Sequence, residues 1–185
     1  MKAIAFDLDM TLVDSRPASQ RALERLVLEH GANLNVETLM SAYGLPLDRW
    51  LPAEIDGALF RTLQAQYIAL AEPMPGAHAA LAAVRDTAAR AVVVTSAPRA
   101  IVGGMLQAAG LCVDSVRTGV WGAEKAKPIR EENCWAFVGD HPDDMLAARR
   151  AGVVAIGVNT GTSRPLGAQV ELDDLRAFPA WLASR

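Results

Sequence analysis

The chain has 185 residues, of which 51% are apolar and 21% are charged, and its formal net charge is −3. This length and composition suit one compact core with a small appended unit, and they exclude two full-sized domains and a disordered chain. The lack of a basic excess argues against nucleic acid as a partner. Neither a signal peptide nor an apolar run of roughly 18 residues is present, which argues against a membrane partner. We therefore expect a soluble cytoplasmic protein, either a monomer or a homodimer.

Two cysteines, Cys112 and Cys134, stand beside apolar residues and lack the CxxC spacing of a metal or redox site. They predict two reduced thiols in the core, as a reducing compartment would keep them.

Short apolar runs alternate with helical patterns along much of the chain. Buried strands are expected at residues 2–6, 91–96, 134–140 and 153–158, with weaker ones near 114–117 and 169–172. Amphipathic helices are expected at residues 76–90, 98–110 and 142–152, with a short helix at 174–183. The alternation predicts an α/β fold with a Rossmann-like, doubly wound parallel sheet covered on both faces.

Residues 16–74 interrupt this alternation with helical patterns alone. Helices are expected at about 18–30, 36–43 and 53–71, with Asn35 as an N-cap and turn-rich connections at Pro17 and 73–76. We expect a helical cap at 16–74 inserted into a core formed by 1–15 and 75–185.

Acidic and hydroxyl side chains follow three of the expected strands. Asp7-Leu8-Asp9-Met10-Thr11 follows the first, Thr95-Ser96 ends the second, and Gly139-Asp140 ends the third, with Asp143 and Asp144 just beyond. Since ligands of open parallel sheets bind at the carboxyl ends of the strands, these side chains should converge on one site.

These segments, in this order and with Lys127-Pro128 between the second and third, resemble the four motifs of the haloacid dehalogenase-like (HAD) hydrolases. The resemblance spans almost the whole chain. The helical insert directly after the first motif resembles the small α-helical cap of the phosphoglycolate phosphatase and beta-phosphoglucomutase branch.

The resemblance implies a phosphatase whose chemistry suits these residues. Asp7 would attack phosphorus to form an aspartyl-phosphate, and Asp9, two residues on, would act as general acid and then general base. Mg²⁺ is the implied cofactor, held by Asp7, the Asp9 carbonyl and Asp140, with Asp144 in support. Asp143 would be an N-terminal helix acid.

Substrate contacts follow from the same resemblance. Thr95 would donate its hydroxyl to a phosphate oxygen, and Lys127 would bridge the nucleophile and the phosphate as the cation of the third motif. Lys125 is the alternative, because only a short connection, expected to be a loop, separates these lysines from the next strand. The implied substrate is a small phosphorylated metabolite, with these residues in contact: Met10, Thr11, Thr95, Ser96 and Lys127.

Other residues have two explanations each. Tyr43, Arg49, Trp50 and Trp121 could face the substrate, but aromatic packing and a surface arginine explain them equally well. His141 stands where the family often has serine.

Three other functions compete with a Mg²⁺-dependent phosphatase. A beta-phosphoglucomutase-like phosphomutase is the nearer one, although its branch tends to carry Arg three residues after a cap glycine, where this chain has Leu47 after Gly44. A phosphoacceptor signalling module would group similar residues without a cap. A degenerate HAD protein that binds without catalysis would follow from a misplaced lysine.

Overall fold

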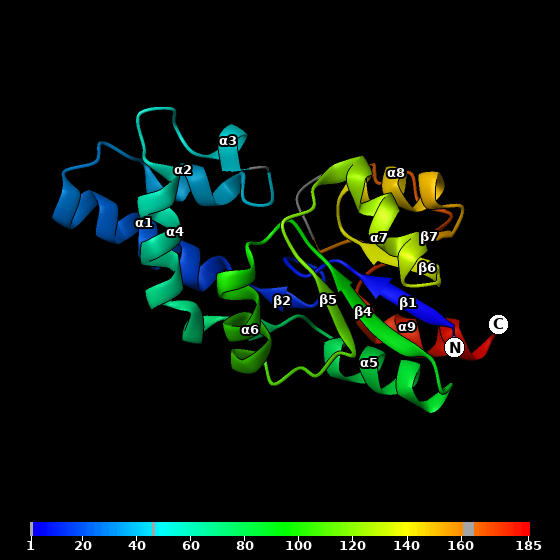
Figure 1. Cartoon of the computed structure of the whole chain (residues 1–185). Coiled ribbons are helices and arrows are strands. Elements are labelled where there is room, and N and C mark those ends of the chain that lie inside the picture. Colours follow the sequence, from blue (N-terminus) through cyan, green and yellow to red (C-terminus); the bar gives the residue numbers. More distant parts are fainter. Residues whose placement is uncertain (1, 46, 161–164) are drawn as a thin grey trace.

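The computed structural model describes residues 2–45, 47–160 and 165–185. Its centre is a six-stranded sheet in the order β5-β4-β1-β6-β7-β8, in which every neighbouring pair is parallel (Figure 1). The strands are β1 (Ala3–Phe6), β4 (Arg90–Val94), β5 (Ser115–Arg117), β6 (Cys134–Gly139), β7 (Val154–Val158) and β8 (Val170–Leu172). The chain winds outward from β1 first on one side and then on the other. The doubly wound α/β fold expected from the sequence is confirmed.

Helices cover both faces of the sheet because the central strands are buried on both sides. Ile4 and Phe6 of β1 pack with α5 (Ala77–Asp86), α6 (Arg99–Ala108) and α9 (Phe178–Ala183). Ala3 and Ala5 point to the opposite face, which α7 (Ala126–Glu131) and α8 (Pro142–Ala151) cover. The alternation along β1 therefore supplies both halves of a three-layer core.

The insert between β1 and β4 forms a separate helical lobe with its own apolar cluster (Figure 1). Its elements are α1 (Arg16–His30), α2 (Val36–Ser41), α3 (Leu47–Trp50), α4 (Gly57–Gln66) and a 3₁₀ turn at Ile68–Leu70. Gly31 ends α1 at a φ of 65°, a left-handed conformation that favours glycine. The Asn35 side chain accepts from the Thr38 N–H at 2.9 Å, as expected of an N-cap.

A two-stranded antiparallel ribbon joins the lobe to the sheet. Its strands are β2 (Val13–Asp14) and β3 (Glu72–Pro73), and the Met74 N–H donates to the Leu12 carbonyl at 2.9 Å just beside it. The chain thus enters and leaves the lobe at one place. A division between a core of residues 1–15 and 75–185 and a cap of residues 16–74 stays a prediction.

Several local expectations differ from the structure. The ribbon and α3 were not predicted, because two- and four-residue elements carry too little periodicity to be recognised. The connection before β6 is not a loop: a 3₁₀ turn at Gly122–Lys125 continues directly into the short helix α7. Cys134 is buried and free, whereas Cys112 is also free but exposed, so the expected core position of Cys112 is wrong. Among the described helices, none combines the length and apolarity needed to cross a bilayer.

Candidate active site

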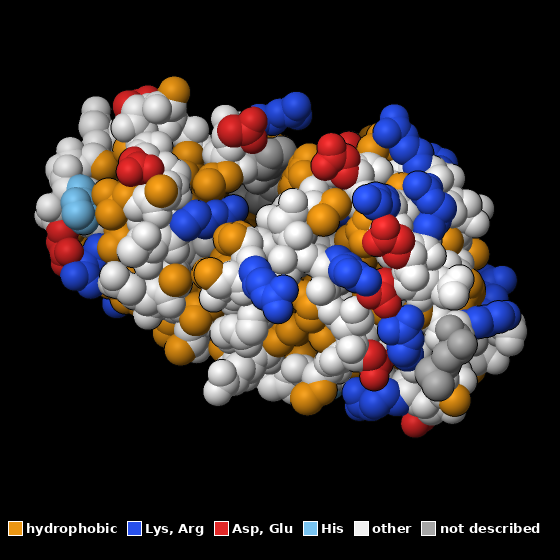
Figure 2. Space-filling view, viewed as in Figure 1, with side chains coloured by type: hydrophobic (Ala, Val, Ile, Leu, Met, Phe, Trp, Pro, Cys, Tyr) orange, Lys and Arg blue, Asp and Glu red, His pale blue; other side chains and the backbone are white. Residues whose placement is uncertain are grey.

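A pocket of about 450 Å³ lies at the carboxyl ends of β1, β4 and β6, between the sheet and the helical lobe. Figure 2 shows the surface hollowed where the helical lobe meets the part of the protein built on the sheet. The sheet side contributes Asp7, Ser96 and Asp140, and the helical lobe contributes residues of α3 and α4 such as Arg49 and Arg61. The site is therefore where the strand order of an α/β sheet predicts it.

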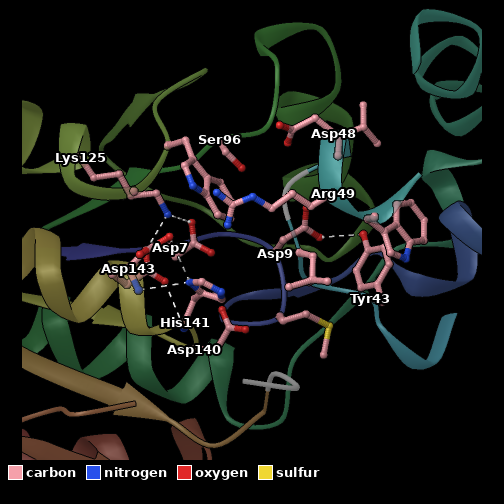
Figure 3. A pocket seen from close by; sticks show the side chains of 18 of the residues that line it. Asp7, Asp9, Tyr43, Asp48, Arg49, Ser96, Lys125, Asp140, His141 and Asp143 are labelled. Atoms are coloured by element: carbon pink, nitrogen blue, oxygen red, sulfur yellow. Dashed lines mark hydrogen bonds and ion pairs between the residues drawn. The ribbon is translucent and has the colours of Figure 1, made fainter. Parts of the chain in front are cut away.

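Lys125 lies between two buried carboxylates. Its Nζ donates to Asp7 Oδ1 and to Asp144 Oδ1, each at 2.7 Å, and its side chain is only 3% exposed (Figure 3). The same ammonium lies 5.6 Å from the ring centroid of Phe137 and 6.0 Å from that of Trp121. Aromatic faces and two acids therefore fix this cation in place.

Burial and crowding set the protonation of these groups. Burial raises the pKa of Asp7 to about 7, Lys125 opposes the shift, and Asp144 adds to it. Burial likewise raises the pKa of Asp140 well above its ordinary value, and the negative charges of Asp7 and Asp144 raise it further. Burial lowers the pKa of Lys125, but Asp144 and Asp7 outweigh that effect, so the net shift is upward. The Lys125 ammonium therefore stays charged, and one positive charge does not offset the mutual repulsion and burial that raise the pKa values of Asp7 and Asp140.

The start of α8 holds Asp144 in this position. The His141 side chain accepts from the Asp143 N–H at 3.1 Å, and Asp144 Oδ2 accepts from the His141 N–H at 3.3 Å, so the two side chains cap the helix reciprocally. Gly139 leaves the space for this arrangement, since a Cβ there would lie 2.5 Å from Asp144 Oδ2. The turn from β6 into α8 thus determines where the acid points.

Asp9 lies on the other side of the pocket from Lys125, toward the helical lobe (Figure 3). Its Oδ1 accepts a short hydrogen bond from Ser15 Oγ, and the Tyr43 hydroxyl lies 3.5 Å away. Burial raises the pKa of Asp9, although the hydrogen bond from Ser15 and the charge of Arg61 oppose the shift. A carboxyl group in this setting favours its protonated form more than one in water does.

Three carboxyl groups suit a divalent cation. Asp7, Asp140 and Asp144 each offer an oxygen, and these oxygens all lie within 4.8 Å of one another. With Lys125 included, the four groups carry a formal charge of −2, which a Mg²⁺ ion would balance. Oxygen ligands of this kind are those that Mg²⁺ prefers. The residues therefore fit the cofactor implied by the sequence.

The comparison with known proteins agrees with this geometry. Residues 4–149 match the family model of the haloacid dehalogenase-like hydrolases. The chain belongs to this family.

Relatives within the family indicate to which of its branches the chain belongs. A phosphoglycolate phosphatase of Rhodospirillum rubrum is 30% identical over an alignment that covers 98% of this chain and 90% of the relative. One of Caulobacter vibrioides is also 30% identical and covers 95% and 88%. The predicted family, its phosphoglycolate phosphatase and beta-phosphoglucomutase-like branch, and the enzyme class are confirmed.

Solved structures of other proteins share the fold. A predicted phosphoglycolate phosphatase from Haemophilus somnus 129pt superposes with a TM-score of 0.74 at 21% identity, covering 100% of this chain and 98% of the other. A Thermotoga maritima chain provisionally named a beta-phosphoglucomutase gives 0.77 at 19% identity, covering 100% and 99%.

Most residues expected at a HAD site lie around this pocket. Asp7, Asp9, Met10, Ser96, Asp140 and Asp144 line it. Thr11 and Thr95 are buried behind the lining: the Thr11 hydroxyl donates to Asp140 Oδ1 at 3.0 Å, and the Thr95 hydroxyl accepts from the Ala97 N–H at 3.1 Å. Met10 has a φ of 57°, which turns the chain between β1 and the ribbon.

The expectation for Lys127 requires correction. Its side chain is 78% exposed, and its Nζ lies 3.9 Å from Glu131, one turn further along α7. Because the 3₁₀ turn runs into α7 without a break, Lys125 faces the site and Lys127 lies on the solvent side of the helix. The alternative lysine therefore occupies the position between Asp7 and Asp144.

Several residues in or beside the pocket were not singled out from the sequence. Arg61 and Gln64 on α4 line the pocket, and Ser15 lies behind the lining, where it donates a hydrogen bond to Asp9. Gln64 is 2% exposed and lies near Phe60 and Leu63 on the buried side of its helix. A polar residue on an apolar helical face was the signal that could have identified it.

Proposed function

We propose that the chain is a Mg²⁺-dependent phosphatase that hydrolyses a small phosphomonoester through an aspartyl-phosphate on Asp7. The observation that carries the proposal is the position of Asp7, paired with Lys125 at 2.7 Å in a pocket that Asp9 also lines. A nucleophile, a fixed cation and a second carboxyl group are the groups that phosphoryl transfer to an acid requires.

The reaction has two steps. An Asp7 oxygen attacks phosphorus, the bond from phosphorus to the leaving oxygen breaks, and Asp9 gives its proton to that oxygen. Water then attacks phosphorus, Asp9 takes a proton from the water, and the bond from Asp7 to phosphorus breaks to release phosphate. Lys125 neutralises negative charge at Asp7 throughout. Asp7, Asp140 and Asp144 would hold Mg²⁺, which supplies positive charge for the phosphoryl oxygens.

The first substrate to test is 2-phosphoglycolate, because the similar proteins from R. rubrum and C. vibrioides are phosphoglycolate phosphatases. The helical lobe also supplies suitable chemistry: Arg49 points into the pocket from α3, and Arg61 lines it from α4 (Figure 3). A guanidinium group pairs well with a substrate carboxylate.

The test is phosphate release from 2-phosphoglycolate and p-nitrophenyl phosphate, measured with Mg²⁺ and with excess chelator. We expect Mg²⁺-dependent turnover of both, and none from Asp7→Asn, which keeps the side-chain volume but removes the nucleophile. Wild-type rates from Asp7→Asn would refute the covalent route. Full activity in chelator would refute the metal requirement.

The phosphomutase is the second candidate. Leu47 holds the position where that branch tends to carry an arginine, but Arg49, two residues on, lines the pocket from the helical lobe. The Arg49 guanidinium would suit the second phosphate of a sugar bisphosphate. Conversion of beta-glucose 1-phosphate to glucose 6-phosphate, faster than release of inorganic phosphate, would favour this candidate over the phosphatase.

A further inference from the structure

A chain of buried hydrogen bonds runs from the helical lobe to Asp9. Gln64 Nε2 donates to Ser19 Oγ at 2.8 Å, and Ser19 Oγ donates to the Tyr43 hydroxyl at 3.1 Å. The Tyr43 hydroxyl lies 2.5 Å from Ser15 Oγ, which donates to Asp9 Oδ1. These hydrogen bonds connect α4, α1 and Tyr43, which follows α2, to Asp9, the general acid of the proposed function.

These hydrogen bonds have one direction when Asp9 is ionised, as it is after it has given up its proton. An ionised Asp9 can only accept, so the single hydrogen of Ser15 is used there, and the Tyr43 hydroxyl donates toward Ser15 at 2.5 Å or toward Asp9 Oδ1 at 3.5 Å. Gln64 can donate only through its amide nitrogen, and its Oε1 accepts from Arg61 Nη1 at 2.9 Å. Every bond therefore donates toward Asp9, and such chains polarise one another.

The polar groups of these hydrogen bonds are buried, so each would cost free energy if it lacked a hydrogen-bond partner. Ser15 and Ser19 are 0% exposed, Gln64 is 2% exposed and Tyr43 is 7% exposed. Apolar side chains would fill the same volume without the desolvation penalty of four polar groups. Both ends of this series of hydrogen bonds reach the pocket, since Arg61 at one end and Asp9 at the other line it.

The ring of Tyr43 is fixed independently of its hydroxyl. It packs edge-on against Trp50, with centroids 5.1 Å apart, and Trp50 packs in the same manner on Phe60 at 5.4 Å. Removal of the hydroxyl oxygen alone should therefore leave the packing of the lobe intact.

We propose that Tyr43 is a positioning residue: through Ser15, its hydroxyl holds the Asp9 carboxyl group where it can protonate the leaving oxygen. This inference rests on the proposed function, because it assigns Asp9 as the general acid. It assigns the placement of that acid to the helical lobe instead of to the sheet.

The test compares two substrates of nearly equal shape in the presence of Mg²⁺. The p-nitrophenolate leaving group needs little protonation, whereas the leaving group of phenyl phosphate needs more. Tyr43→Phe should lower kcat/KM for phenyl phosphate at least about fivefold more than for p-nitrophenyl phosphate, because kcat/KM reports the steps up to departure of the leaving group and only phenolate needs the Asp9 proton strongly there. Ser19→Ala, which removes the donor to Tyr43, should show the same selectivity to a smaller extent.

Tyr67→Phe is the matched control, since Tyr67 lies in the same lobe and its hydroxyl accepts from Arg25 Nη1 at 2.8 Å, away from Asp9. It should change neither rate. Equal losses on both substrates from Tyr43→Phe would show a packing role and overturn the proposal, as would wild-type rates on both. If Tyr43→Phe fails to fold, Ser19→Ala decides by the same criterion.

Failure of the proposed function gives a different result. In that case Asp7→Asn hydrolyses both aryl phosphates at wild-type rates. If Asp7→Asn is inactive and the Tyr43 variant shows no selectivity, only the positioning role is refuted.

Discussion

Replacement of Lys125 by alanine would remove the positive charge that lies between Asp7 and Asp144. Both ion pairs are 2.7 Å long and the lysine side chain is 3% exposed, so water cannot replace the lost ammonium fully. Loss of one partner from a buried ion pair typically costs about 3–5 kcal/mol of unfolding free energy. Loss of a preorganised charge from an active site typically lowers kcat by a factor on the order of 10²–10³. We expect both effects in Lys125→Ala.

The stability loss should depend on pH. The pKa of Asp7 is already raised to about 7 with Lys125 present, and removal of the cation raises it further. A carboxyl group with a raised folded-state pKa destabilises the ionised protein as pH rises above its unfolded value, so the deficit of metal-free Lys125→Ala should be largest above about pH 7 and shrink toward pH 5. Urea unfolding followed by tryptophan fluorescence measures this.

The neighbouring lysine supplies the control. Lys127 is 78% exposed and pairs only loosely with Glu131 at 3.9 Å, so Lys127→Ala should change stability by less than about 0.5 kcal/mol and leave kcat/KM within about twofold. The assay is hydrolysis of p-nitrophenyl phosphate. A crippled Lys127→Ala beside an active Lys125→Ala would show that the register of the third motif is wrong. Activity in both variants would show that no lysine is needed.

Three further results are expected. Asp9→Asn should accumulate a phosphoenzyme from p-nitrophenyl phosphate, because attack by Asp7 proceeds while hydrolysis lacks its base; intact-mass spectrometry that finds no added phosphate would contradict this. Mg²⁺ should raise Tm more near pH 8 than near pH 5.5, since the raised pKa of Asp7 keeps a proton in competition with the metal at lower pH, and equal shifts would count against the metal site. Gly139→Ala should lower activity and cost about 1–3 kcal/mol, because the new Cβ would lie 2.6 Å from the Cβ of Asp144; Gly103→Ala, with no atom within 4 Å of its new Cβ, is the control for unfolding and kinetics.

Most of the sheet could be predicted because its four longer strands are largely continuous apolar runs, whereas the three-residue strands β5 and β8 gave weaker signals. Parallel strands buried on both faces need such runs, and β1, β4, β6 and β7 all show them. The acidic residues of the pocket follow these strands directly. Because parallel strands end at the same edge of the sheet, the strand order alone predicts that these residues converge. Strand periodicity and motif order together were sufficient for this part of the site.

The lysine could not be placed by the same reasoning. Its position depends on whether the segment before β6 is a loop or a helix, and α7 has only six residues. A helix this short is stabilised by packing on α8 more than by its own propensity, so the sequence gives little signal for it. A difference of two residues then separates a buried ammonium from an exposed one.

The polar residues that connect the helical lobe to Asp9 could not be predicted from the sequence at all. Ser15 and Ser19 lie at the start of α1, whereas Tyr43 follows α2 and Gln64 lies in α4, and the contacts among these segments form only when the helices pack. No sequence motif joins them. Their relation to Asp9 is a property of tertiary structure alone.

The antiparallel ribbon at Val13–Asp14 and Glu72–Pro73 also affects how the chain folds. β1 must pair with β4 across the whole helical insert, which would ordinarily close a long loop. Once the ribbon forms, the two ends of the insert are adjacent, and the remaining path from β1 to β4 is short. Loop-closure entropy grows only by about 0.6 kcal/mol for each doubling of length, so the insert can lengthen or shorten with little effect on the central strand pairing. The four paired residues of the ribbon thus separate folding of the sheet from variation in the helices that line the pocket.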